Sequence, residues 1–581
     1  MLPARTHCFI LGQSLPIVIS VLAAACPAVA EDRTPGSGQY VRAEKAMVVS
    51  ATRHASRAGR DVLRRGGNAV DAAVATAFAL AVTWPEAGNI GGGGFMMIYP
   101  ADGKQPVCID YRETAPGAAT PTMFKHDARR HTGKMAGVPG TVRGLALAHR
   151  EYGRLPWKDL VLPAAKLAEE GFEVDRQLAR SVNRVLQSPP QPPKPRFAEL
   201  RRVYGKPGGG PWRAGDRMIL GDLAATLRRI AIEGPDAFYS GEIADRIVAE
   251  MRRADGIMTK TDLEIYRAKV RKPIRGTYRG YEVFGPPPPS SGGICLVQML
   301  NVLENFDLRS HGRYSARNMH VMAEAMRRAF RDRAEYLGDV DFVRIPRHLT
   351  DKAHARRLAG GIDIRAATAS ESLAREIELA TESPDTTHFS VIDSDGTAVS
   401  NTYTLEASWG SRIVVRGAGF LLNNEMGDFN RNPGHTDRRG GIGTKPNQIM
   451  PHKRMLSSQT PVIIARDGHV VLVTGSPGGR TIINTVLQVV LNVVEFEMDL
   501  PDSVASPRLH HQWFPDQLEF EGLNEDRYSA AVDQLRAAGH SLRLPGGSGR
   551  QGSAHSILVD PRTGTLHGVA DRRCGGEASG Y

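Results

Sequence analysis

The stretch from Asn68 to Thr83 constrains the fold most, because it predicts a helix that is apolar on nearly every face. Asn68 can cap the start of this helix, and the apolar run stops before Pro85. Such a helix is buried on all sides, so the chain must build a core that encloses it. Its 581 residues, 41% of them hydrophobic and 23% charged, suffice for that and exclude a disordered or fibrous protein.

The first thirty residues have the pattern of a secretory signal peptide. Arg5 precedes an apolar run from Phe9 to Ala25, and Ala28-Val29-Ala30 forms an A-x-A cleavage site. We therefore expect residues 1–30 to be removed on export and the mature protein to be periplasmic or secreted. Cys26 leaves a lipoprotein as the second alternative.

The remaining cysteines and the net charge narrow the class of protein further. Cys108, Cys295 and Cys574 are an odd number at wide spacings, which favours neither a disulfide framework nor a metal site. The net charge of +12 comes from scattered basic residues and not from the clustered stripe that a nucleic-acid groove needs. It indicates either a bias toward anionic small solutes or no specific function, and we expect no nucleic-acid partner.

Two further motifs could suggest a bound group but do not support one. The four glycines from Gly91 to Gly94 precede a buried strand without completing a nucleotide-binding motif. His510 and His511 are adjacent, and neighbouring side chains on a strand point in opposite directions, so they cannot easily share one ion. We therefore expect neither a metal nor a cofactor.

The composition changes abruptly before Thr386. Residues 367–384 are polar and charged without an apolar period, which predicts an exposed, mobile loop. Residues 386–393 then read as a strand, 394–396 as a turn and 397–405 as the returning strand of a hairpin. A three-residue turn would place Thr386 opposite Thr404.

A second hairpin leads to a helix that glycines introduce. Residues 461–465 and 469–474 predict its two strands, Gly475 to Gly479 follow, and residues 481–496 predict a long helix. A strand, glycines and a helix N-terminus gather several free N–H groups, which suits an anion or an oxyanion. The segment Pro286 to Gly293 similarly leads into a helix or strand of the core.

Thr386 is a candidate nucleophile. A threonine hydroxyl needs an adjacent base, and one arrangement supplies the residue's own α-amine by cutting the peptide bond before it. That amine has an ordinary pKa of about 7.7–8.0, close to working pH. The Asp385–Thr386 bond, between a polar loop and a buried strand, would be accessible to such a cut. The alternative is that Thr386-Thr387 merely reflects β-propensity.

Across essentially the whole mature length, the sequence resembles the γ-glutamyltranspeptidases, N-terminal nucleophile hydrolases secreted as precursors that cleave themselves into two subunits. The motifs that carry the resemblance are Gly67-Asn68-Ala69-Val70-Asp71-Ala72-Ala73, Gly91-Gly92-Gly93-Gly94-Phe95, Asp110-Tyr111-Arg112-Glu113, Pro287-Pro288-Pro289-Ser290-Ser291-Gly292-Gly293, Thr386-Thr387-His388, Leu422-Asn423-Asn424-Glu425-Met426, Leu456-Ser457-Ser458, Gly475-Ser476-Pro477-Gly478-Gly479 and Ala578-Ser579-Gly580-Tyr581.

The resemblance implies an α+β fold, the four-layer αββα sandwich of that superfamily. Residues 31–385 would form the large subunit and residues 386–581 the small catalytic subunit of a heterodimer. The implied activity is cleavage of glutathione and other γ-glutamyl compounds, with transfer of the acyl group to water or to an amino-acid or dipeptide acceptor.

The resemblance also implies roles for individual residues. Thr386 would be the nucleophile for self-cleavage and catalysis, Thr404 would hydrogen-bond it, and His388 would serve packing. The other implied positions are Arg112, Ser457 and Ser458 for the donor's α-carboxylate, Glu425 and Asp428 for its α-ammonium, and Gly478 and Gly479 for the oxyanion hole.

Two positions depart from the family pattern. Glu406 stands where the family usually has Asn among the donor contacts, and we expect its charge to favour hydrolysis over transfer. In the segment 433–447, which resembles a lid over the donor pocket, the usual aromatic is replaced near Arg439.

Two other functions stay open. One is an acylase of the same family that acts on glutaryl-type amides, and the other is a non-catalytic secreted binding protein. Arg112 and Asp428 favour an amino-acid donor over a glutaryl group, because an amino acid needs both an anion site and a cation site. A binding protein would be expected to lose Thr386 or the glycine pair.

The sequence predicts self-processing. The purified protein should run as two chains on a denaturing gel, and sequencing of the smaller should begin Thr-Thr-His. The Thr386→Ala protein should stay uncut, since it lacks the attacking hydroxyl. An active enzyme that consists of one intact chain would contradict this mechanism.

Overall fold

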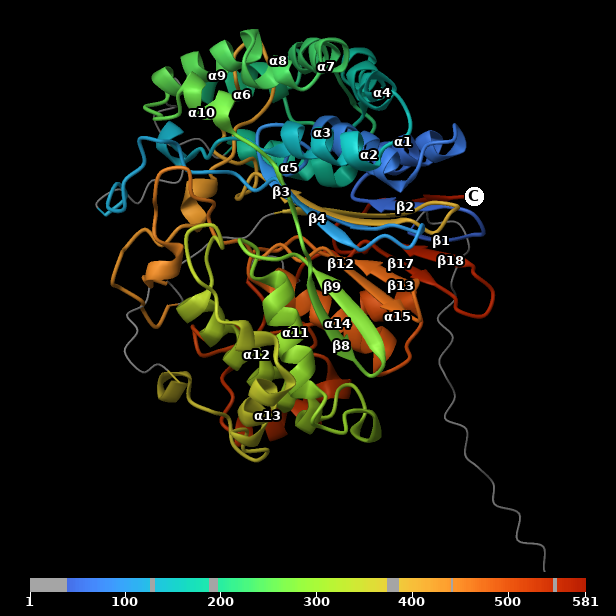
Figure 1. Cartoon of the computed structure of the whole chain (residues 1–581), viewed down its shortest axis with the longest axis vertical. Helices are drawn as coiled ribbons and strands as arrows, with labels where there is room; N and C mark the ends of the chain where they lie inside the picture. Colours follow the sequence, from blue (N-terminus) through green and yellow to red (C-terminus); the bar gives the residue numbers. More distant parts are fainter. Residues whose placement is uncertain (1–38, 126–130, 188–196, 374–385, 440–441, 547–550) are drawn as a thin grey trace, which may run out of the picture. The chain divides into compact units, whose positions relative to one another are not determined.

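Two seven-stranded sheets lie at the centre of the protein (Figure 1). The computed structural model describes residues 39–125, 131–187, 197–373, 386–439, 442–546 and 551–581. The predicted signal peptide, residues 374–384 of the predicted exposed loop and Asp385 lie outside these ranges. The described residues belong to one compact unit.

In both sheets, every neighbouring pair of strands is antiparallel. The first sheet has the order β19 (Glu577–Gly580), β2 (Met47–Ser50), β10 (Thr387–Ile392), β11 (Ala398–Thr404), β3 (Gly93–Tyr99), β4 (Val107–Asp110), β7 (Lys269–Arg271). The second has the order β1 (Tyr40–Ala43), β18 (Leu566–Val569), β17 (Ser556–Val559), β13 (His469–Thr474), β12 (Val462–Arg466), β9 (Tyr281–Gly285), β8 (Ile274–Tyr278). Each sheet thus combines strands from before and after Thr386.

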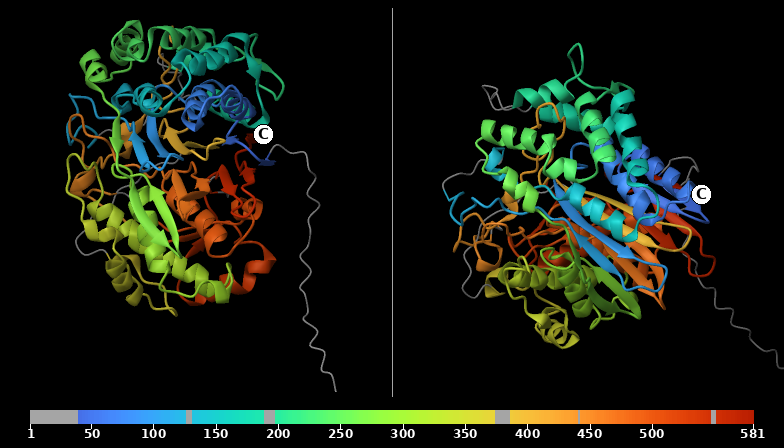
Figure 2. Two further views of the ribbon diagram at one scale, coloured as in Figure 1. Left: turned by 45° about the vertical axis from the view of Figure 1, so that its right-hand side comes forward. Right: turned by 45° about the horizontal axis from the view of Figure 1, so that its top comes forward.

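Helices cover the outer face of each sheet, and the views of Figure 2 show the same layers. Against the first sheet lie α1 (Arg53–Arg64), α2 (Ala69–Thr83) and α3 (Thr141–Tyr152), and against the second lie α11 (Gly292–Leu303), α14 (Thr481–Val494) and α15 (Leu500–Ala505). The predicted αββα sandwich is confirmed.

Further helices and short strands surround these four layers. The helices are α4 (Trp157–Glu170), α5 (Arg176–Gln187), α6 (Ala198–Tyr204), α7 (Gly221–Glu233), α8 (Asp236–Tyr239), α9 (Glu242–Arg253), α10 (Lys260–Ile265), α12 (Ala316–Tyr336), α13 (Lys352–Gly360) and α16 (Ser529–Ala537). The strands are β5 (Phe172–Glu173), β6 (Arg217–Met218), β14 (Leu509–His510), β15 (Leu518–Phe520) and β16 (Leu542–Arg543). None of the helices in the described ranges is both long and apolar enough to cross a membrane.

The two-residue period of the strands explains how one sheet serves two cores. In β3, Phe95 and Met97 face the second sheet, whereas Met96 and Ile98 face the helices. Both faces are apolar, because each is covered by another layer.

The helix predicted from the sequence is α2, and all of its residues are buried. The Asn68 side chain accepts hydrogen bonds from the N–H groups of Val70 and Asp71, and the Asp71 carboxylate accepts one from the N–H of Asn68. This capping box lies at the N-terminus of the helix and gives the N–H groups there hydrogen-bond acceptors in an apolar environment.

The hairpin β10–β11, which follows Thr386 and ends at Thr404, has the predicted register. Thr387 lies opposite Tyr403 and Ile392 opposite Ala398, so extending the pairing by one residue places Thr386 opposite Thr404. The second predicted hairpin is β12–β13, and the helix after its glycines ends at Val494, two residues earlier than predicted.

Two predictions need refinement. The segment after Pro289 enters the core as helix α11 and not as a strand. In the part of the predicted exposed loop that is described, residues 367–373, Ser370 is fully buried and donates a hydrogen bond to the carbonyl of Trp513 at 2.6 Å. The prediction of exposure was wrong there, because a small hydroxyl can be buried once a carbonyl accepts its hydrogen.

The Asp393 carboxylate ties the hairpin turn to helix α2. It accepts hydrogen bonds from the N–H groups of Thr397 at 2.9 Å, Asp395 at 3.0 Å and Ala69 at 2.8 Å. Asp393→Ala should therefore lower the free energy of unfolding by about 3 kcal/mol, because buried N–H groups lose their acceptor. Urea denaturation measures this free energy of unfolding, and the Thr386→Ala background keeps the chain uncut.

Asp395→Ala is the matched control. Asp395 is half exposed and pairs with Arg154 at 2.7 Å, so its loss should cost less than about 1 kcal/mol. Equal losses in the two variants would contradict the role given to Asp393.

Candidate active site

Thr386 lies directly before β10, where the central strand pair of the first sheet ends. Its Oγ1 is 3.5 Å from Oγ1 of Thr404, as the predicted register requires. Thr404 is buried, and its Oγ1 also accepts a hydrogen bond from the N–H of Glu406 at 2.8 Å. The Thr386 hydroxyl therefore has a partner fixed by the neighbouring strand.

His388 lies two residues along the same strand and takes no part in this arrangement. Its Nδ1 hydrogen-bonds the Thr402 hydroxyl at 2.9 Å and its Nε2 the Ser390 hydroxyl at 3.0 Å. Burial, with a smaller contribution from His555, lowers the pKa of His388 well below its ordinary value. The ring is neutral and engaged within the sheets, in agreement with the packing role expected for it.

Gly478 and Gly479 form the turn between β13 and α14. Their φ angles of 131° and 57° lie in the region that favours glycine, and a Cβ on Gly478 would come within 2.5 Å of the Thr481 hydroxyl. The turn lies at the N-terminus of the buried helix α14, and each of the two glycines lines a cavity that Thr386 also lines.

The candidate residues converge on a small cavity of about 20 Å³. Those that line it are Arg112, Thr386, Thr404, Glu406, Glu425, Asp428, Ser457, Ser458 and Gly479. Gly478 lines a larger cavity of about 910 Å³ that also reaches Thr386. Segments as far apart in the sequence as Arg112 and Gly479 therefore meet at the cavity beside the Thr386 hydroxyl.

Arg112 is the charged centre of the small cavity. It is 1% exposed, its Nη1 lies 2.6 Å from Oε2 of the fully buried Glu425, and its Nη2 pairs with Asp428. Glu113 is a third carboxyl, 3.5 Å from Nη1. Burial alone would lower the pKa of Arg112, but these carboxylates raise it, so the guanidinium stays charged.

The carboxyl groups around Arg112 resist ionisation. Burial raises the pKa of Glu113 to about 8. It also raises the pKa of Glu425 well above its ordinary value, and Glu113, Asp428 and Glu406 add to that shift. One arginine cannot compensate so many buried negative charges, so part of the cluster holds protons at neutral pH.

A buried arginine supports the two candidate serines. Arg333 donates from Nη2 to the Ser458 hydroxyl at 3.0 Å and from Nε to the Ser291 hydroxyl at 2.9 Å. Ser291 in turn donates its hydroxyl and its N–H to the Ser457 carbonyl, at 2.7 and 2.8 Å. These bonds fix the loop that carries the serines.

The sequence analysis missed the roles of Glu113, Ser291 and Arg333. Glu113 and Ser291 lie in the recognised motifs, so their place near the site was signalled although no role was assigned. Arg333 lies in a helix rich in charged residues, and its sequence neighbours do not distinguish a buried arginine from an exposed one.

Glu406 adopts a backbone conformation that is unusual for glutamate. Its φ is 77°, in the left-handed region that Asn tolerates better than most other residues. Its buried carboxylate accepts a hydrogen bond from the Asn424 side chain. The departure from Asn thus adds a negative charge to the cavity without changing the backbone expected there.

The segment expected to form a lid is described except for residues 440–441. Arg439 is exposed, and its N–H donates to the Asp437 carboxylate at 2.6 Å. Arg439 does not line either cavity around Thr386.

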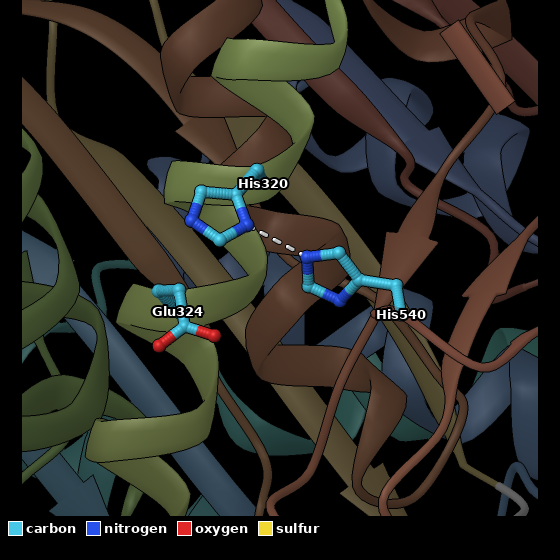
Figure 3. A group of neighbouring side chains, drawn as sticks. All are labelled: His320, Glu324 and His540. Carbon is cyan, nitrogen blue, oxygen red and sulfur yellow. Dashed lines mark hydrogen bonds between the residues drawn. The ribbon is translucent and has the colours of Figure 1, made fainter. Parts of the chain in front are cut away.

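One group of side chains in the described ranges is close enough to share a metal ion: His320, Glu324 and His540 (Figure 3). Nδ1 of His320 hydrogen-bonds Nε2 of His540 at 2.8 Å, and Nε2 of His320 lies 2.9 Å from the Asp363 carbonyl.

Their other interactions make a metal unnecessary. Glu324 pairs with Arg327 and Arg328 on the same helix. Burial, with smaller contributions from His320 and Arg327, lowers the pKa of His540 to about 3. The hydrogen bond between the two histidines and the ion pairs of Glu324 account for the group, and none of it lines the cavities at Thr386.

Comparison with known proteins places this site in a family. The sequence matches the family model Gamma-glutamyltranspeptidase over residues 55–581. It is 45% identical over 543 residues to the glutathione hydrolase proenzyme of Escherichia coli (strain K12), covering 92% of this chain and 91% of that protein. It is 41% identical over 566 residues to the glutathione hydrolase proenzyme of Pseudomonas aeruginosa, covering 95% and 96%.

A solved structure gives the same fold. The crystal structure of cephalosporin acylase from Bacillus halodurans matches with a TM-score of 0.81 at 26% identity, covering 97% of this chain and 99% of that chain. Because the family model spans most of the sequence and both relatives match over nearly their full lengths, the chain belongs to the γ-glutamyltranspeptidase family.

Proposed function

We propose that the protein is an exported γ-glutamyl hydrolase and transferase that acts on glutathione and related γ-glutamyl compounds. The observation that carries the proposal is the position of the Thr386 hydroxyl, 3.5 Å from Thr404 and on the wall of a small cavity that is lined by both a guanidinium and carboxylates. Such a cavity suits the charged α-amino-acid end of a glutamyl group.

Self-cleavage before Thr386 would create the active enzyme. It would separate residues 31–385 from residues 386–581 and free the α-amine of Thr386. Because both sheets interleave strands from the two segments, the chains would stay together as a heterodimer. Residues 1–30 would direct export and be removed.

The free α-amine would then act as the base. It takes the proton from Oγ1 of Thr386, and the oxygen attacks the γ-carbonyl carbon of the donor. The N–H groups of Gly478 and Gly479 stabilise the negative oxygen of the tetrahedral intermediate. The amine of the leaving group departs with a proton, and water or an acceptor amine releases the γ-glutamyl group from Thr386.

Donor binding would exchange partners within the ion-pair cluster. In the structure, Arg112 is paired with Glu425 and Asp428, and the cavity is too small for a glutamyl group. A donor carries a carboxylate that can pair with Arg112 and an ammonium that can pair with Glu425 and Asp428. It can therefore separate Arg112 from the two acids and compensate the charge of each. Ser457 and Ser458 would add hydrogen bonds to the donor's carboxylate.

A glutaryl donor is the weaker alternative, although the neighbouring structure named above is an acylase. It would supply a carboxylate for Arg112 but no cation for Glu425 and Asp428, which would lose the partner that Arg112 now gives them. A non-catalytic binding role is weaker still, since Thr386, Gly478 and Gly479 are all present around the two cavities.

Arg112→Ala should raise the KM for glutathione at least about a hundredfold, because removing one partner of a buried charge pair costs about 3–5 kcal/mol. Self-cleavage should persist, as a denaturing gel would show. Steady-state kinetics give the KM, and Arg150→Ala, which removes an exposed arginine of α3, is the control. An unchanged KM would remove Arg112 from donor recognition.

Donor binding should weaken as the pH falls. Glu425 must be ionised to hold the donor's ammonium, and its raised pKa means that protonation begins well above the usual range for a carboxyl. The KM for glutathione should therefore rise as the pH is lowered from about 8 to 5.

Glu406→Asn tests the cause of this pH dependence. Glu406 is one of the charges that raise the pKa of Glu425, so its removal should shift the rise in KM to lower pH. The backbone of Glu406 suits Asn, so the fold should be kept. Identical pH profiles of KM in the wild type and in Glu406→Asn would contradict the effect of Glu406 on the pKa of Glu425. That Glu406 favours hydrolysis over transfer stays a prediction.

A further inference from the structure

The charged groups that line the larger cavity beside Thr386 are mostly arginines, whereas carboxyl groups outnumber arginines around the small one. Six arginines and two glutamates line the larger cavity, whose volume is about 910 Å³. Two of the arginines are already paired: Arg543 with Glu519, and Arg573 with Glu521 and Asp571. The other four arginines face one glutamate, Glu86. The remaining charge of the cavity wall is strongly positive.

Three of the arginines form a row on helix α5. Arg176, Arg180 and Arg184 are four residues apart, so they project from one face of the helix toward the cavity. All three are exposed, and none makes an ion pair or a side-chain hydrogen bond with any residue that the structure describes. Arg572, on another wall, is also exposed and contacts only a backbone carbonyl, that of Ala505 at 3.5 Å.

Thr386 lines both cavities. The small cavity holds the groups that suit the γ-glutamyl half of a donor, and Gly479 belongs to it, whereas Gly478 belongs to the larger cavity. An amide bond attacked by Thr386 would therefore have its acyl half on the acidic side and its amine half on the side of the arginines.

From this geometry we infer that the larger cavity is a subsite for leaving groups and acceptors that carry two or more carboxylates, such as acidic peptides. The inference rests on the proposed function of Thr386 and adds the substrate class of its amine side. Four arginines without a carboxylate partner exceed what the single carboxylate of a simple dipeptide can pair with. The volume of the larger cavity is in the range of sites that hold small peptides and drug-sized ligands.

A pair of donors tests the inference through catalysis. γ-Glutamyl-4-nitroanilide and γ-glutamyl-3-carboxy-4-nitroanilide differ by one carboxylate on the leaving group. In the α5 variant, which combines Arg176→Gln, Arg180→Gln and Arg184→Gln, kcat/KM for the carboxylated anilide should fall about fivefold, because its one carboxylate loses exposed arginine partners that contribute up to about 1 kcal/mol. It should change less than about twofold for the neutral anilide. Parallel changes for both anilides would overturn the inference.

A control variant removes the same charge elsewhere. It combines three exposed arginines that line neither cavity, Arg201→Gln, Arg252→Gln and Arg317→Gln. Its kcat/KM for each anilide should equal that of the wild type. A denaturing gel on each variant verifies that self-cleavage is complete before rates are compared, and a loss of selectivity in the control variant would also count against the inference.

Binding without turnover separates this inference from the proposed function. N-acetyl-tri-α-glutamate carries four carboxylates and no γ-glutamyl amide, and calorimetry should show it binding the wild type with an affinity that falls as salt is added. The α5 variant should bind it at least about tenfold more weakly, and the control variant should not. If the wild type cleaves neither anilide, the proposed function fails, while this binding still decides whether the cavity takes polycarboxylates. Equal affinity in all three proteins would overturn the inference.

Discussion

The pairing of β10 with β11 at the centre of the first sheet is the constraint on which the site depends. These strands lie between β2 and β3, which come from the other part of the chain, so the hairpin is held on both sides and covered on both faces. Asp393 anchors its turn to the N-terminus of α2. The register of β10 and β11 places the Thr386 hydroxyl 3.5 Å from that of Thr404. A nucleophile needs such positioning more than it needs many partners.

Around this fixed hydroxyl the charges are divided between two sides. On one side Arg112 is enclosed by carboxyl groups, and burial makes every unpaired charge there costly. On the other side the arginines of α5 border a wide cavity and remain solvated. The first environment favours a ligand that carries both charges in a small volume, and the second favours negative charge over a larger one. This division is the physical basis of the donor and amine subsites proposed above.

Much of the local structure could be predicted from the sequence. The buried helix after Asn68, the register of the first hairpin and the glycine turn before α14 follow from capping, a two-residue period and a turn of three residues. The resemblance to the family predicted the four layers and the set of residues that meet at the small cavity. Ser370, predicted to be exposed, shows the limit of composition, because its burial depends on a carbonyl of Trp513 far along the chain.

The sequence by itself therefore determined the elements, the strand register and the family, because these depend on neighbouring residues or on motifs that stand together in the chain. Only the tertiary structure decided the electrostatics of the site. It paired Arg112 with Glu425 and Asp428, raised the pKa of Glu113 to about 8, and turned one face of α5 toward the larger cavity. The physical reason is that burial and the distances between charges that are remote in the sequence set these properties, and both arise only when the layers have packed.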